Sequence, residues 1–201
     1  MDRPDLPFET NRLALRTFSA DDLADISDYY VLPQVQRYLD ITARDGGDVK
    51  RALDSLRNQK RLQRPGDALA LAVVRRVDDV VIGHVVLRWT DATANQAELR
   101  FVFNPIYGRQ GYAREAVEAA LELGFDRLGF HRMFARCSAK DAPAAQLLRQ
   151  VGMRLEAHFK EHKLFQGEWD DELHFALLDR EWRCGNKVTE LTRYSVANSA
   201  A

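Results

Sequence analysis

The segment Asn104–Leu128, NPIYGRQGYAREAVEAALELGFDRL, constrains the fold of this chain more than any other. It opens with a turn and a loop that holds Gly108 and Gly111, and then changes to a helical pattern. Small and apolar residues recur on one helix face, at Val117, Ala120, Leu121, Gly124, Phe125 and Leu128. The start of a helix presents N–H groups without intrahelical partners and the positive end of the helix dipole. A glycine loop that enters such a helix suits a phosphate or pyrophosphate.

On its own, a loop with two glycines three residues apart is more typical of a tight turn than of a ligand site. The residue types and spacing in this segment also exclude two common nucleotide-binding motifs. No Lys-Ser or Lys-Thr pair follows the glycines, which excludes a P-loop. No third glycine stands at the Rossmann spacing, and no acidic residue ends a second strand at the distance that this motif requires. The flanking residues therefore decide how the loop is interpreted.

The residues before the loop predict a strand that carries a carboxylate. In Ala97–Phe103, AELRFVF, apolar residues alternate with Glu98, Arg100 and Val102. A second strand is predicted after the helix, at His131–Ser138. Strand, loop, helix and strand form a β-α-β unit, with Glu98 just before the loop. From these residues alone, Glu98 is interpreted as an exposed strand carboxylate paired with an arginine.

At residues 97–153 the chain resembles the core of the GNAT superfamily of acyl-CoA-dependent N-acetyltransferases, through AELRFVFNPIYGRQGYAREAVEAALELGFDRLGFHRMFARCSAKDAPAAQLLRQVGM. The early TNRLALRTF, the later GEWDDELHFALL and the pair Glu181-Trp182 are similar to its ribosomal-protein N-terminal (Rim-type) acetyltransferase branch. The resemblance covers residues 8–182. It implies an α+β (α/β) fold: a mixed, mostly antiparallel central sheet of about seven strands flanked by helices, whose β-α-β unit binds acyl-CoA.

The resemblance also implies how the site works. Acetyl-CoA is the cosubstrate, a primary amine is the acceptor, and no metal takes part. Glu98 is the catalytic residue, a general base that takes the amine proton directly or through water. In this family the sheet splays beside the Glu98 strand, the pantetheine arm inserts like an extra strand, and a backbone N–H near Val102 or Phe103 serves the thioester carbonyl. The pyrophosphate lies on Arg109–Arg114. The expected cofactor-binding residues are Phe101, Val102, Phe103, Gly108, Arg109, Gln110, Gly111, Tyr112, Ala113, Arg114, Asp141 and Leu148.

The chain departs from the family pattern at positions near the expected site. Many relatives have Gln or Arg at Gly108; here the loop amides and Arg109 are expected to compensate. Relatives usually have Asn at Asp141, where Asp still accepts a hydrogen bond but adds a negative charge. They often have Tyr at Leu148 or Ser at Ala144, near the thiol. Because both hydroxyls are missing, the general acid is unassigned.

The composition bounds the number of domains and the class of protein. With 201 residues, 46% of them hydrophobic, the chain is long enough for one sizeable core. We expect a single acetyltransferase domain at 1–182 and a tail at 183–201. Cys137 and Cys184 form no CxxC motif, so reduced thiols in a cytoplasmic protein are expected. No apolar run approaches the ~20 residues that span a membrane, and a net charge of −1 gives no support for a nucleic-acid partner.

The remaining pattern predicts further elements around this unit. Strands are expected at 11–18, 68–77, 80–89, 153–165 and 169–178, and a helix at 48–63. The basic residues on the outer side of that helix are interpreted as a solvated face, with steering of an anionic substrate as the alternative. His158 and His162 lie on a predicted strand without a third ligand, so a zinc site is not expected.

Two hypotheses of different classes follow. The leading one is an enzyme, monomer or homodimer, that acetylates a primary amine. The outer signatures favour a peptide N-terminus, and an aminoglycoside, a polyamine or another small amine stays open. The rival is a degenerate domain that holds coenzyme A without turnover. Glu98 favours the enzyme, whereas Asp141 and the missing acid favour the binding module.

Overall fold

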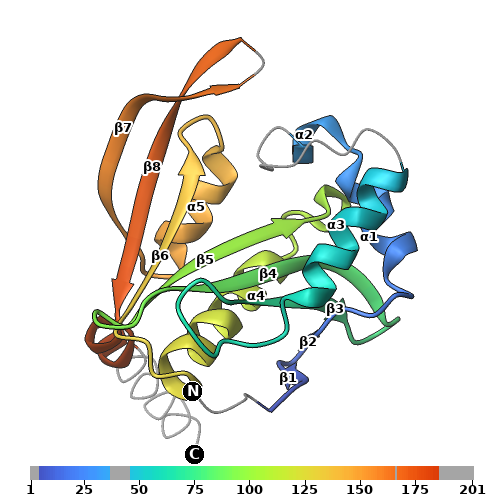
Figure 1. The fold of residues 1–201 in the computed structure, drawn as a ribbon, viewed down its shortest axis with the longest axis horizontal. Helices are drawn as coiled ribbons and strands as arrows, with labels where there is room; N and C mark the ends of the chain where they lie inside the picture. The colour runs from blue at the N-terminus through green and yellow to red at the C-terminus, as the bar shows by residue number, and fades with distance from the viewer. Residues whose placement is uncertain (1–4, 37–45, 166, 186–201) are drawn as a thin grey trace, which may run out of the picture.

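A mixed eight-stranded sheet forms the centre of the computed structural model, which describes residues 5–36, 46–165 and 167–185. The strands are β1 Phe8–Glu9, β2 Leu13–Arg16, β3 Ala68–Arg75, β4 Val80–Asp91, β5 Gln96–Phe103, β6 Arg132–Ser138, β7 Arg154–Phe165 and β8 Glu168–Leu178. Their order is β1-β2-β3-β4-β5-β6-β8-β7, and among the strands described only β5 and β6 pair in parallel (Figure 1). The predicted fold class is confirmed, with eight strands in place of about seven.

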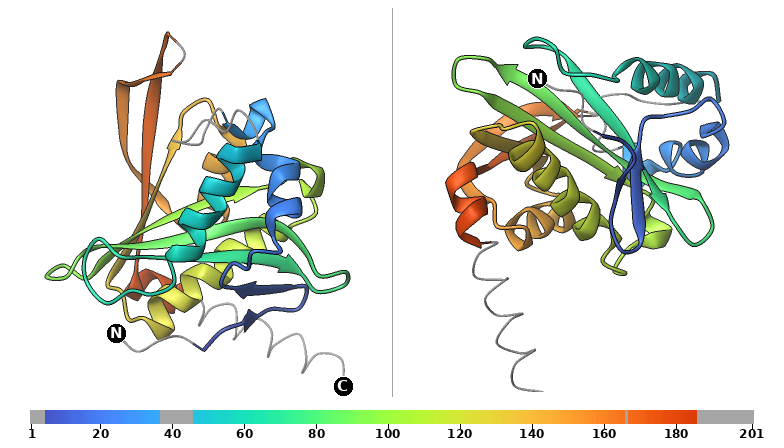
Figure 2. Two further views of the ribbon diagram at one scale, coloured as in Figure 1. Left: turned by 45° about the vertical axis from the view of Figure 1, so that its right-hand side comes forward. Right: turned by 90° about the horizontal axis from the view of Figure 1, so that it is seen from below.

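Helices cover both faces of this sheet (Figure 2). Their bounds are α1 Leu23–Tyr30, α2 Pro33–Gln36, α3 Gly46–Asn58, η1 Pro105–Tyr107, α4 Tyr112–Glu122, the π-helical turn η2 Leu123–Arg127, and α5 Ala142–Gln150. On one face, α4 and α5 bury Val117, Leu121 and Leu148 in the larger core. On the other face, α1 and α3 bury Ile26 and Leu53 in a second core. The sheet therefore separates two packed layers, and its central strands are buried from both sides.

Two elements differ from the sequence prediction. The extra strand β1, Phe8–Glu9, forms by pairing with β2. With only two residues, β1 is too short to show an alternating pattern in the sequence. Helix α3 ends at Asn58 and not at residue 63. The reason is a tertiary contact, because the Ala70 N–H donates to the Gln59 carbonyl at 2.8 Å and Lys60 pairs with Leu69. Gln59 and Lys60 thus lie alongside the start of β3.

Strands β5 and β6 diverge in the middle of the sheet. They pair only through Gln96–Glu98 and Arg132–Phe134. Beyond this point β5 continues along β4, while β6 continues along β8, so the two strands spread apart (Figure 1). This is the splayed sheet that the resemblance implies. Glu98 is the last β5 residue of the paired segment, at the point where the strands separate.

The β7–β8 hairpin extends beyond the rest of the described chain (Figure 1). Its strands pair through Arg154–Phe165 and Glu168–Leu178, close to the predicted ranges 153–165 and 169–178. None of the helices described is both long and apolar enough to cross a membrane.

Candidate functional site

Glu98 is buried although it is charged, with 3% of its surface exposed. Arg136 on β6 donates to Oε1 through Nε at 2.8 Å and Nη2 at 2.6 Å. Arg100, two residues along β5, places Nη2 3.0 Å from Oε2. The arginine pairing expected from the residues alone is therefore present, but the carboxylate is not exposed. Two guanidinium groups fix the direction of this carboxylate.

These contacts leave Glu98 some capacity to accept protons or hydrogen bonds. A carboxylate offers about four acceptor positions. The contacts from Arg136 and Arg100 occupy three of them, two on Oε1 and one on Oε2. A position on Oε2 is thus left for a water molecule or an ammonium group. The geometry allows proton transfer through Oε2 without breaking either ion pair.

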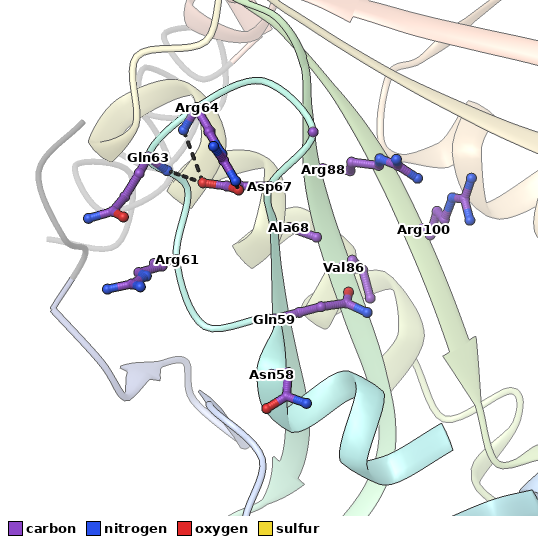
Figure 3. Close-up of a pocket in the computed structure, with 11 residues that line it drawn as sticks. Asn58, Gln59, Arg61, Gln63, Arg64, Asp67, Ala68, Val86, Arg88 and Arg100 are labelled. Atoms are coloured by element: carbon purple, nitrogen blue, oxygen red, sulfur yellow. Dashed lines mark hydrogen bonds and ion pairs between the residues drawn. The ribbon is translucent and has the colours of Figure 1, made fainter. Parts of the chain in front are cut away.

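Two open cavities lie on this side of the sheet, and Glu98 lines the smaller one. The larger, of about 660 Å³, lies between residues 58–68 and strands β4 and β5 (Figure 3). The smaller, of about 410 Å³, is lined by Glu98, Arg136 and His174 among others. Arg88 and Arg100 line both cavities, so the two lie side by side, and we refer to them together as the hollow. We call this side of the sheet the Glu98 face; its central charged and polar residues are Arg88, Glu98, Arg100, Arg136 and His174.

The glycine loop lies at the opposite end of β5 and is held in an unusual conformation. Gly111 caps α4 with φ +81°, and Arg109 also has a positive φ of +59°. Residues 108–111 are exposed. Arg12, just before β2, supports the loop, since its Nη1 donates to the Gln110 carbonyl at 3.0 Å and its guanidinium stacks 4.5 Å from the centre of the Tyr112 ring. The loop thus presents the first N–H groups of α4 to solvent, which fits a pyrophosphate.

The register of β5 distinguishes between the two backbone N–H groups expected near the thioester. Phe103 pairs with Gly83, and the Asn104 N–H donates to the Ile82 carbonyl at 2.9 Å. In an antiparallel ladder this pattern directs the N–H of Val102 toward β4. The N–H of Phe103 then points to the other side of the strand, into the gap between β5 and β6. Of the two, Phe103 has the geometry to reach a ligand there.

The residues expected near the thiol belong to α5 and β6. Asp141 is the N-cap of α5 and accepts a hydrogen bond from the Ala144 N–H at 3.0 Å. Burial raises its pKa, and that hydrogen bond opposes the shift. Leu148 is fully buried in the larger core, so its side chain offers no surface to a ligand in this conformation. Burial raises the pKa of the Cys137 thiol to about 12, which makes it a poor acid near neutral pH.

Sequence reasoning placed Glu98 but not its partners. Strand alternation does put Arg100 on the same side of β5. Arg136 and His174 come from β6 and β8, and only the pairing register brings them to Glu98. Arg88 stands directly opposite Glu98 on β4. Phe134 is the parallel partner of Glu98, and Arg136 follows it by two residues on the same side of β6. This spacing is the sequence signal that points to Arg136 once the β-α-β unit is recognised.

Comparisons with known proteins agree with this arrangement. The domain family described as "Acetyltransferase (GNAT) domain" matches residues 12–154. The chain is 31% identical, over 173 residues, to a Bacillus subtilis (strain 168) protein named "uncharacterized N-acetyltransferase YnaD", covering 86% of this chain and 97% of the relative.

Two solved structures share the fold. The ribosomal-protein-S5-alanine acetyltransferase from Vibrio fischeri aligns with a TM-score of 0.72 and 19% identity, over 89% of this chain and 99% of its own. The spermidine N-acetyltransferase from Vibrio cholerae, solved with CoA and spermine, aligns with a TM-score of 0.72 and 18% identity, over 86% and 99%. The family match, the extent of the YnaD alignment and the splayed sheet together establish that the chain belongs to the GNAT family of N-acetyltransferases.

Proposed function

We propose that this protein transfers an acetyl group from acetyl-CoA directly to the N-terminal amine of a peptide, with Glu98 as the proton acceptor. The observation that carries the proposal is the position of Glu98. It lies where β5 and β6 separate, and it lines the hollow on the Glu98 face. The glycine loop lies at the other end of the gap, before α4. Cosubstrate and amine therefore approach one point from different sides.

Each chemical need of the transfer has a candidate group. The acceptor amine is protonated near neutral pH and has to lose a proton, which Oε2 of Glu98 accepts directly or through water. Acetyl-CoA supplies the thioester carbonyl, and the N–H of Phe103 stabilises the charge that develops on its oxygen. The loop at Gly108–Arg114 holds the pyrophosphate through backbone N–H groups and Arg109. Phe101 and Phe103, on the α4 side of β5, provide an apolar wall for the pantetheine arm.

The peptide N-terminus is the favoured acceptor because the early and late sequence signatures resemble the ribosomal-protein branch. Fold alone does not decide the acceptor, since a ribosomal-protein enzyme and a spermidine enzyme share it. One observation favours a domain that binds CoA without turnover: both oxygens of Glu98 already contact arginines. The two candidates differ in whether thiol is released in the presence of an amine.

An acceptor panel tests the proposal. We expect thiol release from acetyl-CoA with a short peptide that has a free N-terminus, and none with the same peptide blocked by N-formylation. The value of kcat/KM for the peptide should exceed those for spermidine and for an aminoglycoside. Acetyl-CoA binding without thiol release for any amine would support the binding module. A higher kcat/KM for spermidine than for the peptide would mean that the acceptor is a polyamine and not a peptide N-terminus.

The transfer is expected to proceed without a dedicated side-chain acid. Leu148 and Ala144 occupy the positions where relatives place a hydroxyl, and free thiols ionise near pH ~8.5, so the coenzyme thiolate is a fair leaving group. Replacing Tyr112 by Phe, Cys137 by Ala or Ser138 by Ala should each leave turnover within about tenfold. The pH–rate profile of kcat/KM should rise and show no falling alkaline limb below about pH 9. A thousandfold loss in one variant, together with disappearance of such a limb from the wild-type profile, would identify that residue as the acid.

A further inference from the structure

Arg88 is a cation of the Glu98 face that the proposed chemistry does not use. It is exposed on β4 and lines both cavities. Within the part of the chain that the structure describes, its guanidinium makes no ion pair, hydrogen bond or ring contact. Figure 3 shows Arg88 and Arg100 on neighbouring strands, extending to the same side of the sheet. Arg88 is thus a charge directed at the hollow, and no described side chain neutralises it.

The carboxylates that line the two cavities are already engaged. They are Asp67 and Glu98. The Oδ2 atom of Asp67 accepts from the backbone N–H groups of Gln63 at 2.8 Å and Arg64 at 3.0 Å, which holds its pKa below the usual range. Glu98 contacts Arg136 and Arg100. Among the described residues that line the cavities, neither carboxylate is therefore left to compete with an incoming anion for Arg88.

An acidic group that contacts the cavity residue Arg136 is also neutralised. Glu172 on β8 is 2.7 Å from His174 Nε2, 3.0 Å from Lys163 Nζ and 3.8 Å from Arg136 Nη1. Burial alone would raise its pKa, but the hydrogen bonds from His174 and Lys163 outweigh burial, and the pKa lies below its ordinary value. The acidic residues at the start of β8 therefore do not form an uncompensated negative surface, because Asp170, Asp171 and Glu172 all have cationic partners.

We propose that Arg88 binds a carboxylate of the acceptor, so that the preferred substrate is a primary amine carrying a carboxylate a few bonds from its nitrogen. The inference deepens the proposed function and rests on it. Arg88 and Glu98 are direct cross-strand partners, and the Cβ atoms of such partners lie about 5 Å apart. An acceptor whose amine is at Glu98 therefore has its next substituents beside Arg88. Guanidinium recognises carboxylate through paired, charge-assisted hydrogen bonds.

Two kinds of acceptor provide this chemistry. One is a peptide whose first or second residue is Asp or Glu. The other is a free amino acid, whose α-carboxylate is close to its amine. A polyamine offers only further positive charges, which Arg88 repels. The inference thus ranks carboxylate-bearing amines above their neutral counterparts and above spermidine.

Matched acceptor pairs test the inference. One pair is a peptide with Asp or Asn at its second position, the other is free alanine and alaninamide, and spermidine is the cationic acceptor. For wild-type protein, kcat/KM should favour the carboxylate member of at least one pair by about fivefold or more. The pair that shows the preference identifies the source of the carboxylate. Raising the salt from about 0.05 M to about 0.5 M should reduce the ratio.

Variants of Arg88 assign the preference to this side chain. In Arg88→Gln, the kcat/KM values for the carboxylate acceptor and its neutral counterpart should agree within about twofold. In Arg88→Glu, kcat/KM should be higher for the neutral acceptor or for spermidine than for the carboxylate acceptor. Arg51→Gln is the matched control, because Arg51 is an exposed arginine on α3 that pairs with Asp48 outside both cavities. It should leave the ratio unchanged. Melting temperatures establish that all three variants fold.

The outcomes are separable from those of the proposed function. If no amine releases thiol, the proposed function and the inference both fail. If peptides are acetylated with equal efficiency for Asp and Asn, and alanine shows no advantage over alaninamide, the inference alone is wrong. It is also wrong if Arg88→Gln weakens binding of acetyl-CoA in calorimetry while the ratio stays the same, since Arg88 then serves the cosubstrate.

Discussion

Glu98→Gln should lower the rate of acetyl transfer by about 10²–10⁴-fold, with little change in acetyl-CoA affinity. The substitution keeps the shape of the side chain and an oxygen for Arg136 to contact, but it removes the group that accepts the amine proton. The loss should be greatest near pH 7, where free amine is scarce. Steady-state thiol release, together with calorimetric titration of acetyl-CoA, measures both quantities. Wild-type turnover in this variant at pH 7 would remove Glu98 from the mechanism.

The burial of Glu98 makes controls necessary, because its replacement alters an ion-pair network as well as a base. Glu156→Gln is the matched change, since Glu156 is also a strand carboxylate paired with two arginines, Arg132 and Arg154, but lies outside the cavities. It should leave turnover close to wild type. His174→Gln tests a rival base that lines the same cavity. If that variant loses more activity than Glu98→Gln, the proton acceptor is His174.

Gly111→Val should weaken acetyl-CoA binding by at least about tenfold, because a β-branched residue at positive φ costs about 1–3 kcal/mol. Gly111 has φ +81°, and a Cβ there would lie 3.3 Å from Nη2 of Arg12, which supports the loop. The backbone has to change, and the N–H groups proposed to hold the pyrophosphate lose their direction. Calorimetry with acetyl-CoA measures the effect.

A second glycine separates loss of the binding loop from general backbone strain. Gly129 also has a positive φ, +69°, and is exposed, and a Cβ atom added to it would meet open space. It follows the π-helical turn after α4 and is not in the glycine loop. Gly129→Val should lower the melting temperature while acetyl-CoA affinity stays near wild type. Equal affinity for Gly111→Val and wild type would exclude the loop from the cosubstrate site.

Much of the fold follows from local patterns. Alternation predicts β5, and runs of apolar residues bounded by turn residues predict β3 and β4. The apolar stripe at Val117, Ala120 and Leu121 predicts α4, and those residues are buried. The two errors arise where tertiary contacts decide. The two residues of β1 are too few to show a strand pattern in the sequence. Helix α3 ends at Asn58 because the next residues pair with the start of β3.

The site is less predictable than the fold because its charges come from different strands. Resemblance and alternation lead to Glu98 and Arg100 on β5. The contact with Arg136 depends on the parallel register of β5 and β6, across 38 residues of sequence. The position of Arg88 opposite Glu98 depends on the antiparallel register of β4 and β5. A single sequence does not specify these registers, so neither the burial of Glu98 nor the cationic character of its surroundings could be anticipated.

Single-turnover kinetics test the central claim most directly. The claim is that acetyl-CoA held by the α4 loop is attacked directly by an amine at Glu98. Protein loaded with acetyl-CoA is mixed rapidly with the peptide, and the reaction is quenched. The masses of both the peptide and the protein are then measured by mass spectrometry. We predict acetyl only on the peptide amine, at a rate that falls about 10²–10⁴-fold in Glu98→Gln even when acetyl-CoA saturates that variant. An acetyl group that appears first on the protein and then moves to the peptide, or a saturated Glu98→Gln variant as fast as wild type, would contradict the account.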